Sequence, residues 1–202
     1  MTILTVILLG WILVSTIMLL CWFLQRNIHD AGIVDVAWAA NLALMALLYA
    51  LALDGDPMRR YLLLALAGIW YLRLALYLLF NRVIGKEEDG RYQRLRQTWQ
   101  GNIQGFFFGF FQLQGVLDVI LSLSFLAVAV NPTPLLTPWD TLAIALFALA
   151  WLGESLADYQ LARFRANPAH QGQTCRVGLW KYSRHPNYLF EWLHWWIYPL
   201  LA

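Results

Sequence analysis

The sequence predicts an all-α fold: a polytopic membrane bundle of about six helical segments, with its N-terminus outside. The first reason is composition, since hydrophobic residues make up 60% of the 202 residues and charged residues only 13%. The second reason is that the apolar residues are gathered in long runs, which is typical of integral membrane proteins. Both observations argue against a soluble globular protein.

The first apolar run, Thr2 to Leu24, has 23 residues and no charge. A helix needs about 20 such residues to cross the hydrocarbon core of a bilayer. No basic segment precedes the run and no small-residue cleavage site follows it, so we expect a retained span and not a cleaved signal peptide. Four further runs have the length of a span: Ile33 to Leu53, Tyr61 to Phe80, Phe106 to Val130, and Thr141 to about Leu161.

A sixth apolar run, Tyr188 to Ala202, is only 15 residues long. This is short for a full crossing, so we expect either a re-entrant segment or a span that continues beyond Ala202. Prolines stand between the runs, where they are expected to stop helices: Pro57, Pro132, Pro134 and Pro138. The sequence has no internal repeat and no low-complexity linker, which favours a single domain over residues 1–202.

Basic residues indicate the orientation, because cytoplasmic loops carry an excess of Lys and Arg. With the N-terminus outside, the inward loops hold 11 of the 14 Lys and Arg residues: Arg26, Arg82, Lys86, Arg91, Arg94, Arg96, Arg163, Arg165, Arg176, Lys181 and Arg184. The outward loops hold only Arg59 and Arg60, and Arg73 lies inside a span. We therefore expect a multi-pass protein with its basic loops in the cytoplasm.

Each long apolar run after the first carries polar residues on one helical face. Glu154 and Asp158 are four residues apart in the fifth run, which puts both carboxylates on one face. Similar sets are Asp35 with Trp38, Trp70 with Arg73 and Tyr77, and Gln114 with Asp118. Ionisable groups persist next to lipid only when they are paired or face a wet cavity, so we expect these faces to turn toward one another. For Gln114 and Asp118 the simpler interpretation is hydrogen bonding between helices.

The densest polar cluster is the motif Gly178-Leu-Trp-Lys-Tyr-Ser-Arg-His-Pro-Asn-Tyr188, with Glu191 shortly after it. Pro186 disfavours helix at His185 and suits the first turn of a new helix, which predicts a helix from about Asn187. One face of that helix would carry Asn187, Glu191, His194 and Tyr198. Free backbone amides at its start predict a site for the phosphate or carboxylate of a large cytosolic ligand. The nearby cations are Arg176, Lys181 and Arg184.

Four elements of the chain resemble a bacterial membrane family related to steroid 5-alpha-reductase. They are the 178–188 motif with Glu191, Glu154-x-x-x-Asp158-x-Gln160, Trp70-x-x-Arg73-Leu74, and Glu88-Asp89-Gly90-Arg91-Tyr92. The resemblance runs from about Asp35 to Tyr198. Isoprenylcysteine carboxyl methyltransferases have a similar Arg-His-Pro-x-Tyr motif, but Trp180, Asn187 and Glu191 favour the reductase family.

The resemblance implies an enzyme of the bacterial inner membrane, an oxidoreductase that uses NADPH to reduce a carbon–carbon double bond conjugated to a carbonyl in a lipid-like substrate, such as a steroid or isoprenoid enone. It also implies cofactor-binding positions. Carried over by position, these are Asp158 and Arg165 for the adenosine half, Arg176 for its phosphates, Asn187 and Tyr188 for the nicotinamide side, and Arg73 and Tyr77 for the pyrophosphate. Arg184 and His185 belong to the same turn, and Glu154 and Glu191 would orient these groups.

The catalytic positions that the resemblance implies are Asp35, Trp70 and Glu191. Trp70 stands where steroid reductases place a catalytic Tyr, and Asp35 is the acid nearest to the place of their Gln-Glu pair. Phe190 replaces the Gly that the family usually has before its Glu, and we expect it to crowd that turn. Relatives continue with another helix and a basic tail, so we expect this domain to lack its C-terminal helix and tail, a seventh segment.

Two other functions fit the same residues. One is an S-adenosylmethionine-dependent methyltransferase of a lipid thiol or amine; the other is a lipid-binding or scaffold protein whose polar faces only hold helices together. As partners we expect a hydrophobic small-molecule substrate and membrane lipid, and neither nucleic acid nor metal. Glu87, Glu88 and Asp89 are expected to form a solvated loop face, although their recurrence in the family pattern suggests a loop ordered over the cofactor.

Overall fold

The structure is a computed structural model that describes residues 1–135 and 137–202. Its described residues form helices joined by loops, and no strand occurs among them. The predicted all-α class is therefore confirmed. The chain divides into two compact units, Met1–Thr133 and Pro134–Ala202, and each is described by itself. The single domain expected over residues 1–202 stays a prediction.

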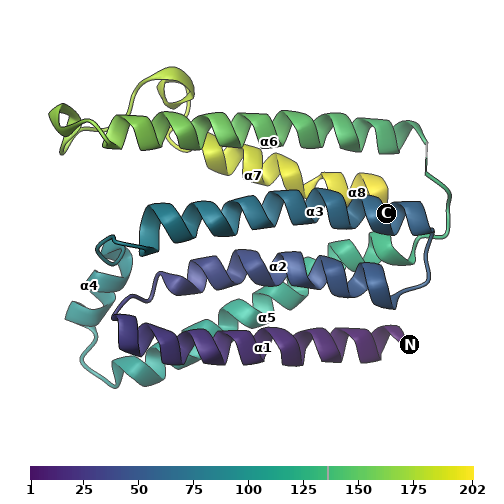
Figure 1. Cartoon of the computed structure of the whole chain (residues 1–202), viewed down its shortest axis with the longest axis horizontal. Coiled ribbons are helices and arrows are strands. Elements are labelled where there is room, and N and C mark those ends of the chain that lie inside the picture. Colours follow the sequence, from purple (N-terminus) through teal and green to yellow (C-terminus); the bar gives the residue numbers. More distant parts are fainter. Residues whose placement is uncertain (136) are drawn as a thin grey trace. The chain divides into compact units, whose positions relative to one another are not determined.

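Four long helices build the first unit (Figure 1). They are α1 (Ile3–Ile28), α2 (Ile33–Ala52), α3 (Pro57–Leu78) and α5 (Ile103–Val130). A π-helical turn, η1 (Leu79–Val83), continues α3, and the short helix α4 (Gly90–Thr98) precedes α5. In Figure 1, α4 lies at the end of the unit where α1 finishes and α2 starts.

Helix α2 is the centre of this unit, because it packs against α1, α3 and α5. In the most apolar stretch of α2, 61% of the residues are buried, compared with 22% in the corresponding stretch of α1. Alanines at buried positions of α2, such as Ala39 and Ala46, let the neighbouring helices approach closely. The outer helix α1 instead exposes large apolar side chains along most of its length, as a lipid-facing helix would.

The expectation that prolines stop the helices is wrong for Pro57 and Pro138. Each of them lies in the first turn of a helix. Proline suits this position because its missing N–H would have no helical partner there. The residue before each proline caps the helix. Asp56 accepts a 3.0 Å hydrogen bond from the N–H of Arg59, and Thr137 accepts one of 3.2 Å from that of Asp140. Both prolines therefore belong to the spans and not to the connections.

The second unit pairs one long helix, α6 (Pro138–Arg165), with two short ones, α7 (Pro186–Trp195) and α8 (Ile197–Leu201). Figure 1 shows α7 and α8 lying along α6. Two 3-10 turns, η2 (Pro168–His170) and η3 (Gly178–Lys181), lie in the connection. The ring of Phe190 on α7 sits where a Cβ on Gly153 of α6 would be. The bulk of Phe190 is thus accommodated by a glycine on the facing helix.

Five helical stretches among the described residues are long and apolar enough to cross a membrane. They are Ile3–Ile28, Ile33–Ala52, Pro57–Val83, Ile103–Val130 and Pro138–Arg165. The sixth predicted segment does not join them. It is divided into α7 and α8 at Trp196, and the longer piece has 10 residues, about half of what a crossing needs.

Candidate functional site

Helix α3 brings together two residues of the predicted site. Trp70 is fully buried, and the guanidinium carbon of Arg73 lies 6.0 Å from the centre of the Trp70 ring. This is within the range of a cation–π interaction. Tyr77, one turn further on, is half-buried. Of the three residues predicted to share one face of this span, Trp70 and Arg73 are therefore in close contact.

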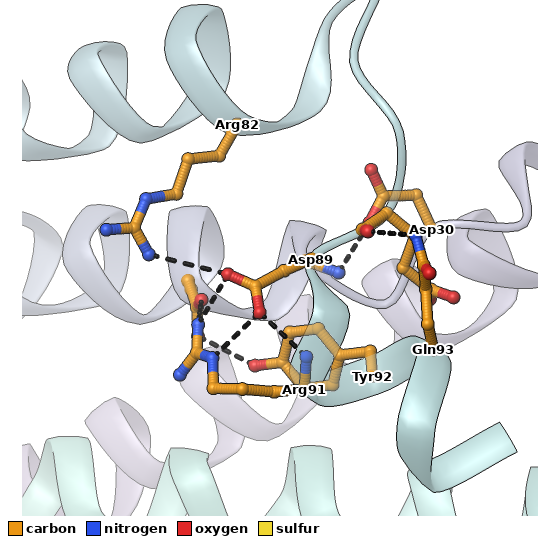
Figure 2. A network of polar contacts seen from close by, with 9 residues as sticks. Asp30, Arg82, Asp89, Arg91, Tyr92 and Gln93 are labelled. Carbon is orange, nitrogen blue, oxygen red and sulfur yellow. Dashed lines mark hydrogen bonds and ion pairs between the residues drawn. The ribbon is translucent and has the colours of Figure 1, made fainter. Parts of the chain in front are cut away.

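Asp35, in the first turn of α2, is held by residues of α4. Its two carboxylate oxygens accept 2.9 Å hydrogen bonds, one from the guanidinium of Arg91 and one from the hydroxyl of Tyr92 (Figure 2). Burial of Tyr92 and the nearby charge of Asp35 raise the pKa of the phenol above its usual range. Tyr92 therefore remains a hydrogen-bond donor, and Asp35 is an anchored carboxylate at one end of the first unit.

The loop acids Glu88 and Asp89 continue this network (Figure 2), so the expectation of a solvated loop face is wrong for them. The side chain of Glu88 is only 9% exposed. It forms a 2.9 Å ion pair with Arg96 and accepts a 2.7 Å hydrogen bond from the N–H of Ala31. Asp89 pairs with Arg91 at 3.0 Å and with Arg82 at 3.7 Å. The third acid, Glu87, is exposed as expected.

The surroundings of Asp89 favour its ionised form. Burial acts to raise its pKa, but the hydrogen bonds from the Arg91 side chain and backbone N–H, with the charges of Arg91 and Arg82, lower the pKa below its ordinary value. The hydrogen bond to Asp89 is likewise the main reason why the pKa of Arg91 is raised. Asp89 also caps α4, because it accepts a 2.9 Å hydrogen bond from the N–H of Arg91.

Asp30, which the sequence reasoning missed, lies in the same region, but its pKa is raised where that of Asp89 is lowered. It is 6% exposed, and one oxygen accepts a 2.8 Å hydrogen bond from the N–H of Gly32. Its other oxygen is buried and has no hydrogen bond within the described residues. Burial is the main cause that raises the pKa of Asp30, and the charges of Glu88 and Asp89 add to it. An acid two residues before a Gly in a loop carries no sequence signal for such burial.

In the second unit, the predicted acidic face of α6 is buried. Glu154 and Asp158 are 3% and 4% exposed. Arg165, in the last turn of α6, is exposed. The two carboxylates and this cation therefore differ in accessibility, although the sequence places all three along one stripe.

The turn η3 is docked on α6 by two hydrogen bonds of 2.9 Å. The N–H of Leu179 donates to the side chain of Gln160, and the indole N–H of Trp180 donates to the carbonyl of Ala157. Gly178 has a positive φ of 57° and lies so close to Gln160 that a Cβ would overlap its amide. This docking fixes the motif beside the acidic stretch of α6. Its flanking cations are exposed: Arg176, Lys181 and Arg184.

Helix α7 begins at Pro186, so the start predicted near Asn187 is confirmed within one residue. The ring of His185 stacks on that of Tyr188, with centroids 5.1 Å apart, and both residues are exposed. Asn187 is half-buried, and its side-chain oxygen is buried without a hydrogen bond within the described residues.

The predicted polar face of α7 is partly confirmed by a contact further along it. The hydroxyl of Tyr198 lies 2.7 Å from Nε2 of His194, across the break between α7 and α8. Both residues are fully buried, and Glu191, one turn before His194, is half-buried. Asn187 and Glu191 are therefore the members of this face that retain exposed surface.

The predicted site takes residues from both units. The first unit supplies Asp35, Trp70, Arg73 and Tyr77, and the second supplies the rest. Within each unit the structure brings several of them together: Trp70 with Arg73, His185 with Tyr188, and the docked turn with α6. That the two sets share one binding site stays a prediction.

Five long apolar helices with buried polar residues define an integral membrane protein. The chain belongs to a family described as a protein of unknown function (DUF1295), whose sequence profile matches residues 21–202. The match begins in α1 and includes both units. No curated protein and no solved structure matches the chain.

Proposed function

We propose that this protein is an NADPH-dependent reductase of the bacterial inner membrane, which reduces a carbon–carbon double bond conjugated to a carbonyl in a lipid-like substrate at the cytoplasmic side. The observation that carries the proposal is the docking of the 178–181 turn on α6 through Gln160 and Ala157. It tethers the exposed cations Arg176 and Arg184 to the helix with the buried acids, in one compact unit.

The donors and acceptors of this unit suit a dinucleotide phosphate. Exposed guanidinium groups bind phosphate by paired, charge-assisted hydrogen bonds, and three residues of the predicted site supply them: Arg165, Arg176 and Arg184. The buried side-chain oxygen of Asn187, which has no hydrogen bond within the described residues, is an acceptor for an amide N–H such as that of a nicotinamide carboxamide. Under the proposal Tyr188 lies on the same side, while Glu154 and Asp158 orient the adenosine half.

The cofactor, when bound, supplies a hydride for the β carbon of the enone. The protein must then stabilise negative charge on the carbonyl oxygen and supply a proton. Among the predicted catalytic residues, Asp35 already accepts hydrogen bonds at both of its oxygens, from Arg91 and Tyr92, and so serves to hold α4. Trp70 has an indole N–H that can donate a hydrogen bond but not a proton. Glu191 is therefore the acid that we propose as proton donor, with Trp70, Arg73 and Tyr77 positioning substrate and cofactor.

The test is ligand-induced thermal stabilisation of the purified protein in detergent, with NADPH, NADH and S-adenosylmethionine in parallel, because a ligand that binds the folded state raises its stability. We expect a shift with NADPH that is larger than with NADH. A shift with S-adenosylmethionine alone would favour the methyltransferase, and no shift with any of the three would favour a lipid-binding or scaffold protein.

A pair of variants tests the residue assignment. Asp158→Ala combined with Asn187→Ala should abolish the NADPH shift, whereas Gln171→Ala, at an exposed position of the same unit, should leave it unchanged. An NADPH shift that survives the double substitution would overturn the proposed site without touching the proposed activity. Enone reduction by the wild-type protein, followed by NADPH absorbance, tests that activity separately.

A further inference from the structure

Two hollows follow one another along the contact between α1 and α5. The first, of about 660 Å³, lies at the end of α1 and is lined by Trp22, Arg26, Asn102, Gln104, Gly105 and Phe108. The second, of about 310 Å³, lies further along the same two helices, from Trp11 to Leu19 of α1 and at Phe108 and Gln112 of α5. Phe108 lines both, so the two hollows adjoin at this residue, and we refer to them together as the groove of the first unit.

The first hollow offers hydrogen-bond donors without a carboxylate partner. Arg26 is exposed, lies 5.1 Å from the centre of the Trp22 ring, and makes no ion pair with any described residue. The side-chain oxygen of Asn102 is used to cap α5, since it accepts hydrogen bonds from the N–H groups of Gln104 and Gly105. Its amide nitrogen is left pointing to no described acceptor. This end of the groove therefore suits an anion.

The second hollow has an apolar wall. Two of its polar side chains are hydrogen-bonded within the protein: the hydroxyl of Thr16 donates to the backbone carbonyl of Ile12 at 2.7 Å, and the side-chain amide of Gln112 donates to the backbone carbonyl of Ser15 at 3.3 Å. The exposed side chains of Trp11, Ile12 and Phe108 complete the lining. A hydrocarbon chain fits such a wall better than a polar ligand does, because most of the side chains that line it are apolar and would leave the polar groups of a ligand without partners.

The depth of the groove matches one leaflet of a bilayer. With a rise of about 1.5 Å per residue, Leu19 lies roughly 10 Å and Trp11 roughly 22 Å from Arg26 along α1. Half of a bilayer is about 20–22 Å deep when its headgroups are included, and about 15 Å of this depth is hydrocarbon. A phospholipid has an anionic headgroup at the membrane surface and acyl chains that extend toward the bilayer centre. The groove has the matching order, with Arg26 beside Trp22 at one end and an apolar wall further along α1.

We propose that this groove binds an anionic glycerophospholipid, with its phosphate on Arg26 and Asn102 and an acyl chain along Trp11, Thr16 and Phe108. The proposal concerns the first unit alone and does not depend on the reductase function. It requires only that the Arg26 end of α1 lies at a membrane surface, whichever side of the membrane this is.

The experiment measures lipid binding to the full chain in detergent, by native mass spectrometry and by thermal stabilisation, with phosphatidylglycerol and phosphatidylcholine at equal mole fraction. We expect phosphatidylglycerol to bind more tightly. Arg26→Gln removes a charge-assisted hydrogen bond and should weaken phosphatidylglycerol binding about tenfold or more, while Arg26→Lys should keep part of it. The matched control is Arg94→Gln, which removes an exposed cation of the same unit outside both hollows.

A second variant tests the apolar part. Thr16 is exposed, so Thr16→Trp should fill the groove without disturbing the core, and should weaken the binding of both lipids. Equal binding of the two lipids, with Arg26→Gln behaving like Arg94→Gln, would overturn the proposal. So would a wild-type dimer that Thr16→Trp converts to a monomer, because the groove would then belong to an interface between two copies.

Discussion

The side-chain amide of Asn41 on α2 donates a 2.9 Å hydrogen bond to Asp118 on α5, and both residues are fully buried. Asn41 is the hydrogen-bond partner of Asp118 among the described residues, and each side chain keeps one buried oxygen without a hydrogen bond. The pair joins the two helices at the centre of the first unit. The interpretation of Asp118 as a hydrogen-bonding link between helices is thus confirmed.

This pair predicts a coupling that a double-mutant cycle can measure. Asn41→Leu or Asp118→Leu alone leaves a buried polar partner unsatisfied and should lower the free energy of unfolding by about 1–2 kcal/mol. The double variant should cost less than the sum of the two, with a coupling of about 0.5–1.5 kcal/mol. Unfolding in mixed micelles gives these values. Asp118→Asn, which keeps a donor and an acceptor, should stay close to the wild type, and additive losses would contradict the prediction.

Tyr92→Phe should loosen α4 without unfolding the membrane helices. The substitution removes the 2.9 Å hydrogen bond to Asp35, and a hydrogen bond to a charged group contributes about 1.5 kcal/mol or more. Hydrogen exchange should therefore become faster in α4 and stay unchanged in the middle of α2. Tyr61→Phe, at an exposed tyrosine of α3, is the control. Equal protection of α4 in both variants would show that the hydrogen bond does not hold the helix in place.

Asp30→Asn should stabilise the protein at neutral pH. Because the pKa of Asp30 is raised in the folded state, its contribution to stability is fully present below its ordinary pKa of about 3.9 and is lost as the pH rises through the folded pKa. The neutral amide keeps an acceptor for the N–H of Gly32 and removes this loss. The melting temperature should rise at pH 7 and change little near pH 4. The exposed Asp54→Asn serves as control, and a destabilised Asp30→Asn at pH 7 would sink the prediction.

Gly153→Ala should destabilise the second unit, although alanine favours helix over glycine by up to about 1 kcal/mol. The new methyl group would overlap the ring of Phe190, and overpacking of this kind costs about 1–3 kcal/mol. Limited proteolysis of the 166–185 connection should become faster. Adding Phe190→Ala should reverse part of the effect. Gly68→Ala on α3, where a methyl group would meet nothing within 4 Å, should be neutral or stabilising.

The sequence suffices for the five long helices because each apolar run carries its own signal over about 20 residues. It also suffices for the start of α7, where Pro186 acts locally. It does not suffice for the pairing of Asp35 with Arg91, which are 56 residues apart, because nothing local distinguishes a solvated acid from a paired one. The same holds for Glu88 and for Asp30. The sequence alone is ambiguous for Pro57 and Pro138, because proline suits both the residues after a helix and the first turn of the next one, where the structure places them.

The candidate site was predictable to the extent that its residues are close in sequence. Trp70 and Arg73 share a helical face, and His185 and Tyr188 lie within one turn, so spacing alone places them. The docking of Trp180 on Ala157 depends instead on a tight turn at Gly178 and on the length of the connection. A single sequence gives the residue types of such a turn but not the carbonyl that it reaches.

The network of Asp35, Glu88 and Asp89 also sets an order for assembly in the membrane. Asp35 and the N–H of Ala31 are separated from their partners Arg91, Tyr92 and Glu88 by the whole of α3, so these bonds cannot form while α3 is still emerging. Helices α1 and α2 can pair as soon as both are inserted, but α4 gains its partners only after α3 has crossed and the loop has returned. During synthesis the acids and arginines of this loop therefore stay in water until the first three helices are in place.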